Sequence, residues 1–134
     1  MRAFIEALKG ELSPKFPTVR ISTLQNQEQL LTEIKAINPE KLPGVIIVFD
    51  DLILNSNEGI CEHHLTLVAV ARFTAASDEK ALNALECIDR LLELFPADGR
   101  SLAGMYVHPT DCTAAAPAAA YAAFALGLTC KKGF

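Results

Sequence analysis

A chain of 134 residues can bury one hydrophobic core, and its length fits one domain. Apolar residues make up 51% of it and charged residues 21%, which excludes a disordered chain and indicates a globular protein. The formal net charge is -4 and the basic residues are scattered, so nucleic-acid binding, which needs a basic surface, is not expected.

Targeting signals and cysteine usage place further bounds on the chain. Arg2 and Glu6 interrupt the start before an apolar block forms, so we expect no signal peptide. No apolar run reaches the roughly 18 residues of a membrane span, so we expect no membrane helix. Because the cysteines form no Cys-x-x-Cys pair and match no zinc spacing, we expect free thiols in a reducing compartment rather than a disulfide framework. The four cysteines are Cys61, Cys87, Cys112 and Cys130.

The first half of the chain alternates between helical and extended patterns. The expected elements, in order, are a helix at 3–12, a short strand at 19–22, a helix at 27–37 and a strand at 45–49. Prolines end the first helix, and Asn38-Pro39 ends the second. The continuous β-branched run at 45–49 predicts a central strand covered on both sides. The polar segment 50–59 is expected to be a loop.

The second half is expected to contain a strand at 63–74, a helix at 78–95 and strands at 105–108 and 119–130. The odd-numbered side chains of 63–74 form the drier face, which should meet the helices. Segment 109–118 is expected to be an irregular link. Alanine content would allow a helix at 119–130, but alternation favours a strand. The buried stripe predicted for helix 78–95 is Ala81, Leu85, Ile88, Leu92 and Phe95, and Cys87 is expected to be a small core residue.

This order of elements predicts a single α+β domain over residues 1–134. Strands that follow one another through short connections favour antiparallel pairing. We therefore expect one mostly antiparallel β-sheet of about four to five strands, with two to three helices packed on one face. No internal repeat divides the chain.

The stretch Cys61-Glu62-His63-His64 is the strongest candidate for a metal site. In a strand, Cys61 and His63 would point to one face, and Glu62 and His64 to the other. A zinc site needs three or four converging ligands, so a further ligand would have to come from Cys112, His108 or a neighbouring subunit. We favour a partly solvated strand entrance. The alternative is a small metal-binding protein or hydrolase that uses Cys61, His63 and His64.

Other chemical signals are weaker. Asp50 and Asp51 follow a strand and could bind a cation or act as acid and base, although a solvated turn is favoured. Cys112 lies near His108 and Asp111 in the sequence, like a nucleophile constellation, but nothing indicates an oxyanion hole. We therefore predict no catalytic, cofactor-binding or metal-binding residues, and a protein that works through its surfaces. Segments 50–59 and 109–118 are expected either to contact partners or to be ordinary surface loops.

A family resemblance rests on the order of elements and several short segments. The first helix ends at 12–17 and a strand follows at 19–21. A Leu-Pro-Gly entry to a strand lies at 42–44, and a later strand ends in Arg-Phe-Thr at 72–74. A long helix at 79–92 and a glycine-bounded turn at 99–104 follow. Over nearly the whole chain this pattern resembles the tail terminator (tail-completion) proteins of long-tailed phages, in particular the group found in Mu-like phages and prophages.

The resemblance implies a non-enzymatic protein without a cofactor, which forms a hexameric ring on the growing tail tube. Such a ring stops tube polymerisation and gives head-completion proteins a docking surface. The implied partners are further copies of the chain, the tail tube protein and a head-completion protein, in the virion tail and in the host cytoplasm during assembly. A closed ring requires a heterologous head-to-tail interface. An oligomeric adaptor unrelated to phage is a further alternative.

Overall fold

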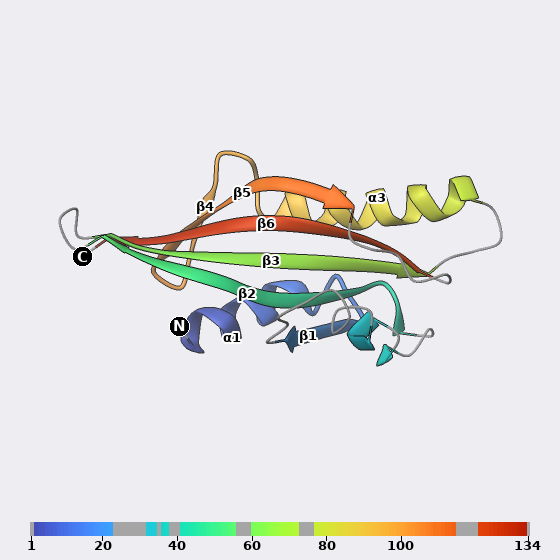
Figure 1. Cartoon of the computed structure of the whole chain (residues 1–134), viewed down its shortest axis with the longest axis horizontal. Coiled ribbons are helices and arrows are strands. Elements are labelled where there is room, and N and C mark those ends of the chain that lie inside the picture. Colours follow the sequence, from blue (N-terminus) through green and yellow to red (C-terminus); the bar gives the residue numbers. More distant parts are fainter. Residues whose placement is uncertain are drawn as a thin grey trace.

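One mixed sheet organises the molecule (Figure 1). The computed structural model describes residues 2–22, 32–34, 36–37, 41–55, 60–72, 77–114 and 121–133. Within this part of the chain, six strands form a sheet of order β1-β2-β3-β6-β5-β4. The strands are β1 (Thr18–Ser22), β2 (Gly44–Asn55), β3 (Ile60–Arg72), β4 (Arg100–Leu102), β5 (Met105–Ala114) and β6 (Tyr121–Gly133). The helices with defined bounds are α1 (Arg2–Leu12) and α3 (Ser77–Leu94).

The α+β class with a single, mostly antiparallel sheet is confirmed. β1 pairs with β2 in parallel, and the other neighbouring strands pair antiparallel. The expected strand count of four to five was too low, because β4 is a sixth strand. It has three residues, too few for an alternating pattern to reveal it in the sequence.

The first core lies between one face of the sheet and the two helices. Phe4, Leu8 and Leu12 of α1 are buried there with Leu91 and Phe95 from the end of α3. The odd-numbered side chains of β3 meet these helices, as predicted, and Leu65 and Leu67 are almost fully buried. Each such side chain contributes about 1.5–3 kcal/mol, so this face fixes the position of both helices.

A second, smaller core lies on the opposite face. Ile34 and Ile37 are buried there against Ile46 and Val48 of β2 and Val68 and Val70 of β3. The expectation that the helices share one face is therefore wrong for the helical residues 32–34 and 36, because Ile34 and Ile37 cover the other face. The rest of the predicted helix 27–37 lies outside the described residues. The prediction that strand 45–49 is covered on both sides is confirmed for residues 45–48.

The buried side of α3 differs from the predicted stripe. Leu85 and Leu92 are 48% and 38% exposed, whereas Leu91 is fully buried. Cys87 and Phe95 are buried four residues to either side of Leu91, so the core face is centred on that row. The prediction for Cys87 is confirmed. The side chain of Ala81 lies outside the described residues.

Two segments expected to be irregular are strands. Residues 50–55 extend β2, and residues 109–114 extend β5, while 56–59 and 115–118 lie outside the described residues. A register shift lies between Phe49 and Asp51 in β2, and another between Pro109 and Asp111 in β5. These β-bulges accommodate the polar residues and the proline without ending the strands. The preferred strand assignment for 119–130 is confirmed by β6 for residues 121–130, while 119 and 120 lie outside the described residues.

The three central strands are long. β2, β3 and β6 have 12, 13 and 13 residues, which corresponds to roughly 40 Å each. α1 has 11 residues, or about 16 Å. Figure 1 shows β2, β3 and β6 converging at one end, to the left, beyond the helices.

Candidate functional site

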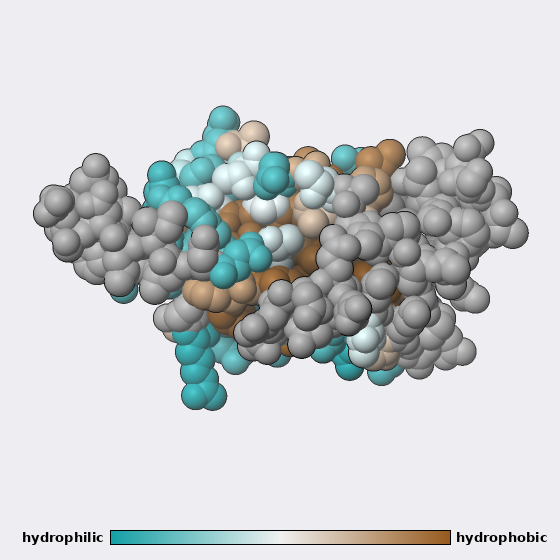
Figure 2. Space-filling view, in the orientation of Figure 1, coloured by the Kyte–Doolittle hydropathy of each residue, from teal (hydrophilic) through white to brown (hydrophobic). Residues whose placement is uncertain are grey.

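The sheet face opposite α1 and α3, called the open face below, has an apolar half and a polar half. Along β3, Val68 and Val70 are buried in the second core, whereas Glu62, His64 and Thr66 on the same face are partly exposed. Figure 2 looks onto this face, where hydrophilic residues gather to the left and hydrophobic residues show through near the centre. Considering the described residues alone, the polar half is therefore the part of this face that is available for chemistry or binding.

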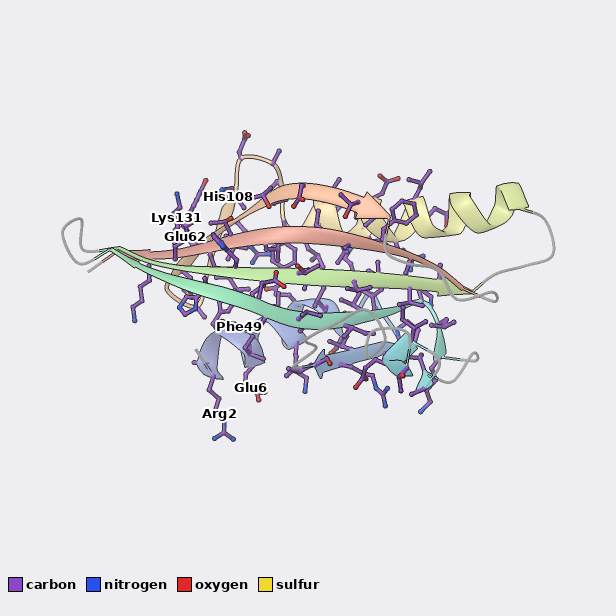
Figure 3. All side chains as sticks on the ribbon, in the orientation of Figure 1. Arg2, Glu6, Phe49, Glu62, His108 and Lys131 are labelled. Carbon is purple, nitrogen blue, oxygen red and sulfur yellow. The ribbon has the colours of Figure 1, made fainter. Side chains whose placement is uncertain are left out.

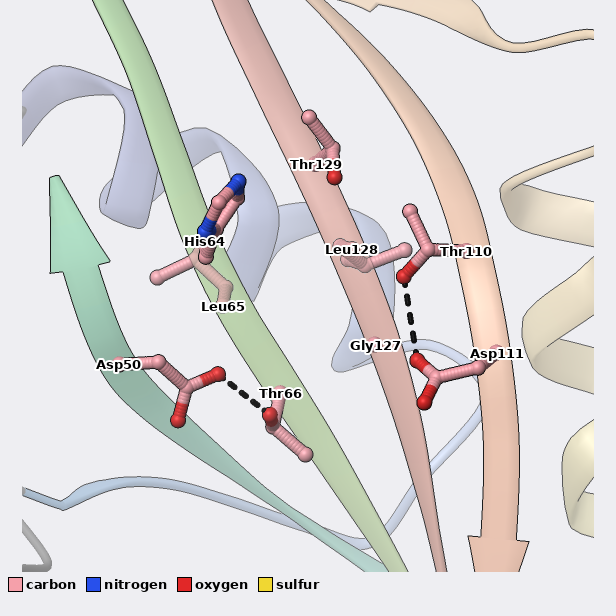
Figure 4. Close-up of a pocket in the computed structure, with 9 residues that line it drawn as sticks. All are labelled: Asp50, His64, Leu65, Thr66, Thr110, Asp111, Gly127, Leu128 and Thr129. Atoms are coloured by element: carbon pink, nitrogen blue, oxygen red, sulfur yellow. Dashed lines mark hydrogen bonds between the residues drawn. The ribbon is translucent and has the colours of Figure 1, made fainter. Parts of the chain in front are cut away.

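A hollow of about 430 Å³ lies in the polar half (Figure 4). It is lined by Asp50, His64, Leu65, Thr66, Thr110, Asp111, Gly127, Leu128 and Thr129. These residues come from four neighbouring strands, β2, β3, β6 and β5. Asp50, His64 and Asp111 each stand out in the sequence, but no sequence pattern places them together.

The β-bulges supply the two acidic walls of the hollow. Thr66 donates a hydrogen bond from Oγ1 to Oδ2 of Asp50 at 2.6 Å. Thr110 donates from Oγ1 to Oδ1 of Asp111 at 3.1 Å. Asp50 and Thr110 are the extra residues at the two register shifts. Each bulge therefore places a hydrogen-bonded carboxylate on the open face.

Gly127 creates the space that Asp111 occupies. A Cβ atom at Gly127 would lie 2.8 Å from Oγ1 of Thr110 and would collide with Oδ1 of Asp111. Only glycine leaves room for both side chains to lie over β6. The glycine is visible in the sequence, but the β-bulge that brings Thr110 and Asp111 over it is not.

A charged cluster adjoins the hollow at the end of β3 (Figure 3). His64 donates from Nε2 to Oε1 of Glu62 at 2.6 Å, and Nζ of Lys131 lies 3.9 Å from Oε2 of Glu62. The hydrogen bond from His64 lowers the pKa of Glu62, partial burial opposes this effect, and the positive charges of Lys131, His64 and His108 lower the pKa further. Figure 3 places Glu62, Lys131 and His108 side by side on this part of the sheet.

The predicted separation of the two histidines is confirmed. His63 pairs with Cys130 in the first core, whereas His64 pairs with Thr129 on the open face. The ring of His63 packs edge-on against Phe49, with ring centroids 6.0 Å apart, and burial lowers the pKa of His63. The side chain of Cys61 lies outside the described residues. Among the described side chains, no group of three or more His, Cys, Asp or Glu is placed to hold a metal ion.

The nucleophile constellation around Cys112 is also separated by alternation. Cys112 pairs with Leu126, which belongs to the first core, while His108 and Asp111 pair with Thr129 and Gly127 on the open face. Partial burial and then the charge of Asp111 raise the pKa of Cys112, which lowers its thiolate fraction at neutral pH. Asp50 lies in a strand rather than in the expected turn, and the side chain of Asp51 is outside the described residues.

The hollow is therefore suited to accepting hydrogen bonds. Its carboxylate and hydroxyl oxygens would accept from ammonium or guanidinium groups. The hydroxyls of Thr66 and Thr110 donate to carboxylates that lie on β-bulges.

No model of a known protein family matches this chain, and none of the curated proteins is significantly similar to it. Within the described part of the chain, neither helix combines the length and the apolar character that a membrane crossing demands.

Proposed function

We propose that this chain is a non-enzymatic tail assembly protein of a phage or prophage. It caps the tail tube as a ring, ends tube polymerisation and provides the surface on which the head docks. The resemblance of the sequence to tail terminator proteins motivates the proposal. The proposed partners are further copies of the chain, the tail tube protein and a head-completion protein.

The observation that carries the proposal is the exposure of large apolar side chains on two sides of the molecule. Ile21 on β1 is 50% exposed and Phe49 on β2 is 42% exposed. Toward the other end of the sheet, Tyr106 on β5 is 46% exposed, and α3 exposes Leu85 and Leu92. Exposed large apolar residues mark interaction surfaces when they gather at one place. A closed ring requires two different surfaces on each copy, and we assign these two sets of exposed residues to them.

Tube length is the direct test of the capping function. The tail tube protein of the same phage or prophage would be polymerised with and without this chain, and tube lengths would be measured by electron microscopy. Capping predicts shorter tubes that carry a ring-shaped density at one end. Native mass spectrometry of the purified chain would give the number of copies in the ring, for which we expect six. Tubes of unchanged length without end density would contradict the proposal.

The same mass measurement, repeated with added zinc, separates the proposal from its rivals. A monomer that carries one zinc ion and loses it on His63→Ala would support a metal-binding protein instead. An oligomer without affinity for tail tubes would support an adaptor unrelated to phage. A metal-free ring that shortens tubes supports the cap.

A further inference from the structure

Among the described residues, the sheet has an open edge at each end, and β1, the outermost strand on one side, pairs with β2 alone. On the other side, β4 pairs with residues 105–107 of β5, so among the described residues 108–114 of β5 pair on one side only, with β6. Each open edge presents backbone N–H and C=O groups that a further strand could pair with. Residues 110–113 are exposed on this edge.

The directions of the two edges fit each other. β1 runs parallel to β2, and three successive antiparallel pairings lead from β2 through β3 and β6 to β5. β5 therefore runs opposite to β1. If copies are related by rotation about an axis along the strands, β1 of one copy meets β5 of the next in an antiparallel pair, and the helices stay on the same side.

The side chains of the two edges are also complementary. Val19 and Ile21 lie on the helix-covered face, because they pair with Val45 and Ile47 of the first core. Cys112 lies on that same face opposite Leu126.

On the open face, Arg20 pairs with Ile46 of the second core and Asp111 pairs with Gly127. Arg20 is the formal positive charge of β1, and Asp111 is the formal negative charge of residues 108–114. The side chain of Arg20 keeps 40% exposure although its Nη1 lies 3.4 Å from Oε2 of Glu33. A neighbouring carboxylate therefore has access to the guanidinium group.

We infer that copies of this chain associate by strand addition, with β1 of one copy pairing antiparallel with residues 108–114 of β5 in the next copy. The register that places Arg20 opposite Asp111 also places Val19 opposite Cys112. The sheet then continues from copy to copy through main-chain hydrogen bonds. The inference rests on the proposed ring, because a contact between two different edges repeats until it closes.

Cysteine crosslinking to the native Cys112 tests this pairing. Val19→Cys would be oxidised under mild conditions and analysed on non-reducing gels, with Ile21→Cys, which lies opposite Thr110 in this register, as a control that should crosslink to Cys112 far less. Directly opposed residues of an antiparallel pair have Cα atoms about 4.5–5.5 Å apart, within the range that a disulfide spans. We expect a ladder of crosslinked multimers that disappears when Cys112→Ser is added, with the linked peptides identified by mass spectrometry.

Arg20→Cys is the matched control, because it lies on the same strand with its side chain on the opposite face. It should give no crosslink to Cys112. Val19 packs against the first core, so the double variant Thr18→Cys/Thr113→Cys, whose two residues oppose each other in the same register on the open face, keeps the test valid if Val19→Cys fails to fold. Circular dichroism of each variant would establish that it is folded.

The outcomes separate this inference from the capping function. A ring seen by native mass spectrometry without crosslinks to Cys112 would overturn the strand pairing and leave the ring intact. Val19→Cys crosslinks that persist in the Cys112→Ser background would show that β1 meets another cysteine, either its own copy in a second chain or a further native one, and would also overturn it. A Cys112-dependent ladder from a protein that leaves tube length unchanged would support the pairing and contradict the cap. An uncrosslinked monomer would overturn the pairing, while the tube-length measurement would still decide the cap.

Discussion

The carboxylate of Asp111 lies over Gly127, in the space that a side chain at position 127 would occupy. Gly127→Ala should therefore displace Asp111 or push β5 away from β6. We expect the free energy of unfolding to fall by about 1–3 kcal/mol, as in other overpacked sites. Urea denaturation would measure it.

Gly10→Ala is the matched control for that substitution. Gly10 lies inside α1, and a Cβ atom there would meet no atom within 4 Å. The change should stabilise the protein by about 0.5–1 kcal/mol, because glycine is unfavourable inside a helix. Equal stability of Gly127→Ala and the wild type would refute the close approach of Asp111. Recovery of stability in the double variant Asp111→Ala/Gly127→Ala would support it.

The turn between β4 and β5 is strained at one residue. Ala103 has a φ of 48° and is followed by Gly104 with a φ of 80°, a pair of positive values that fits the two-residue hairpin turn in which Asn-Gly is favoured. Ala103→Asn should raise the free energy of unfolding by about 1 kcal/mol, since asparagine tolerates this conformation better than alanine. Thermal melting should show an increase of roughly 4 °C. Ala97→Asn, at an exposed position with ordinary backbone, should give no such increase.

Glu62 should make folding stability depend on pH. Its pKa is lowered in the folded state by the hydrogen bond from His64 and by nearby positive charges, against partial burial. A lowered folded-state pKa gives stability that is present above the ordinary glutamate value of 4.5 and is lost as the pH falls through the folded value. Denaturation at several pH values between about 6 and 3 should show a shallower loss for Glu62→Gln than for the wild type. His64→Ala should flatten the curve in the same direction, and two unchanged curves would count against the contact.

The described cysteines should differ in reactivity. Burial raises the pKa of Cys130 to about 12. Burial also raises the pKa of Cys87, and the smaller effects of Arg90, which lowers this pKa, and of Glu86, which raises it, oppose each other. Cys112 is exposed. Alkylation of the folded protein near pH 8, followed by peptide mapping, should therefore modify Cys112 and spare Cys87 and Cys130 until urea is added. Rapid modification of Cys130 in the folded state would contradict its place in the core.

Sequence reasoning succeeded where periodicity and burial coincide. The odd-numbered residues of β3 were assigned to the helix-covered face, and Leu65 and Leu67 are buried there. The same alternation separated His63 from His64. It was less successful on α3, because Leu85 and Leu91 lie in apolar rows of similar quality, and only contacts with the sheet decide which row is buried.

The hollow could not be predicted from local patterns. Asp50 and Asp111 are far apart in the sequence. Each looks like a turn residue, because asparagine and glycine follow Asp50 and a proline precedes Asp111. They meet the same hollow because β2 and β5 each contain a bulge and flank the β3–β6 pair. Bulges depend on how neighbouring strands pair, which is a property of the sheet rather than of a short segment. Similarly, the position of Ile34 and Ile37 depends on which face of the sheet is left uncovered.

The length of β3 gives one strand two levels of local stability. Residues 67–71 belong to the buried cores, whereas residues 62–64 are only partly buried and belong to neither. At the first group, amide hydrogens exchange with solvent only when the domain unfolds. At the second, separation of a few backbone pairs is enough, so exchange there proceeds at a lower free energy. We therefore expect a single continuous strand to contain one segment that opens rarely and one that opens more readily, with the boundary beside the polar hollow.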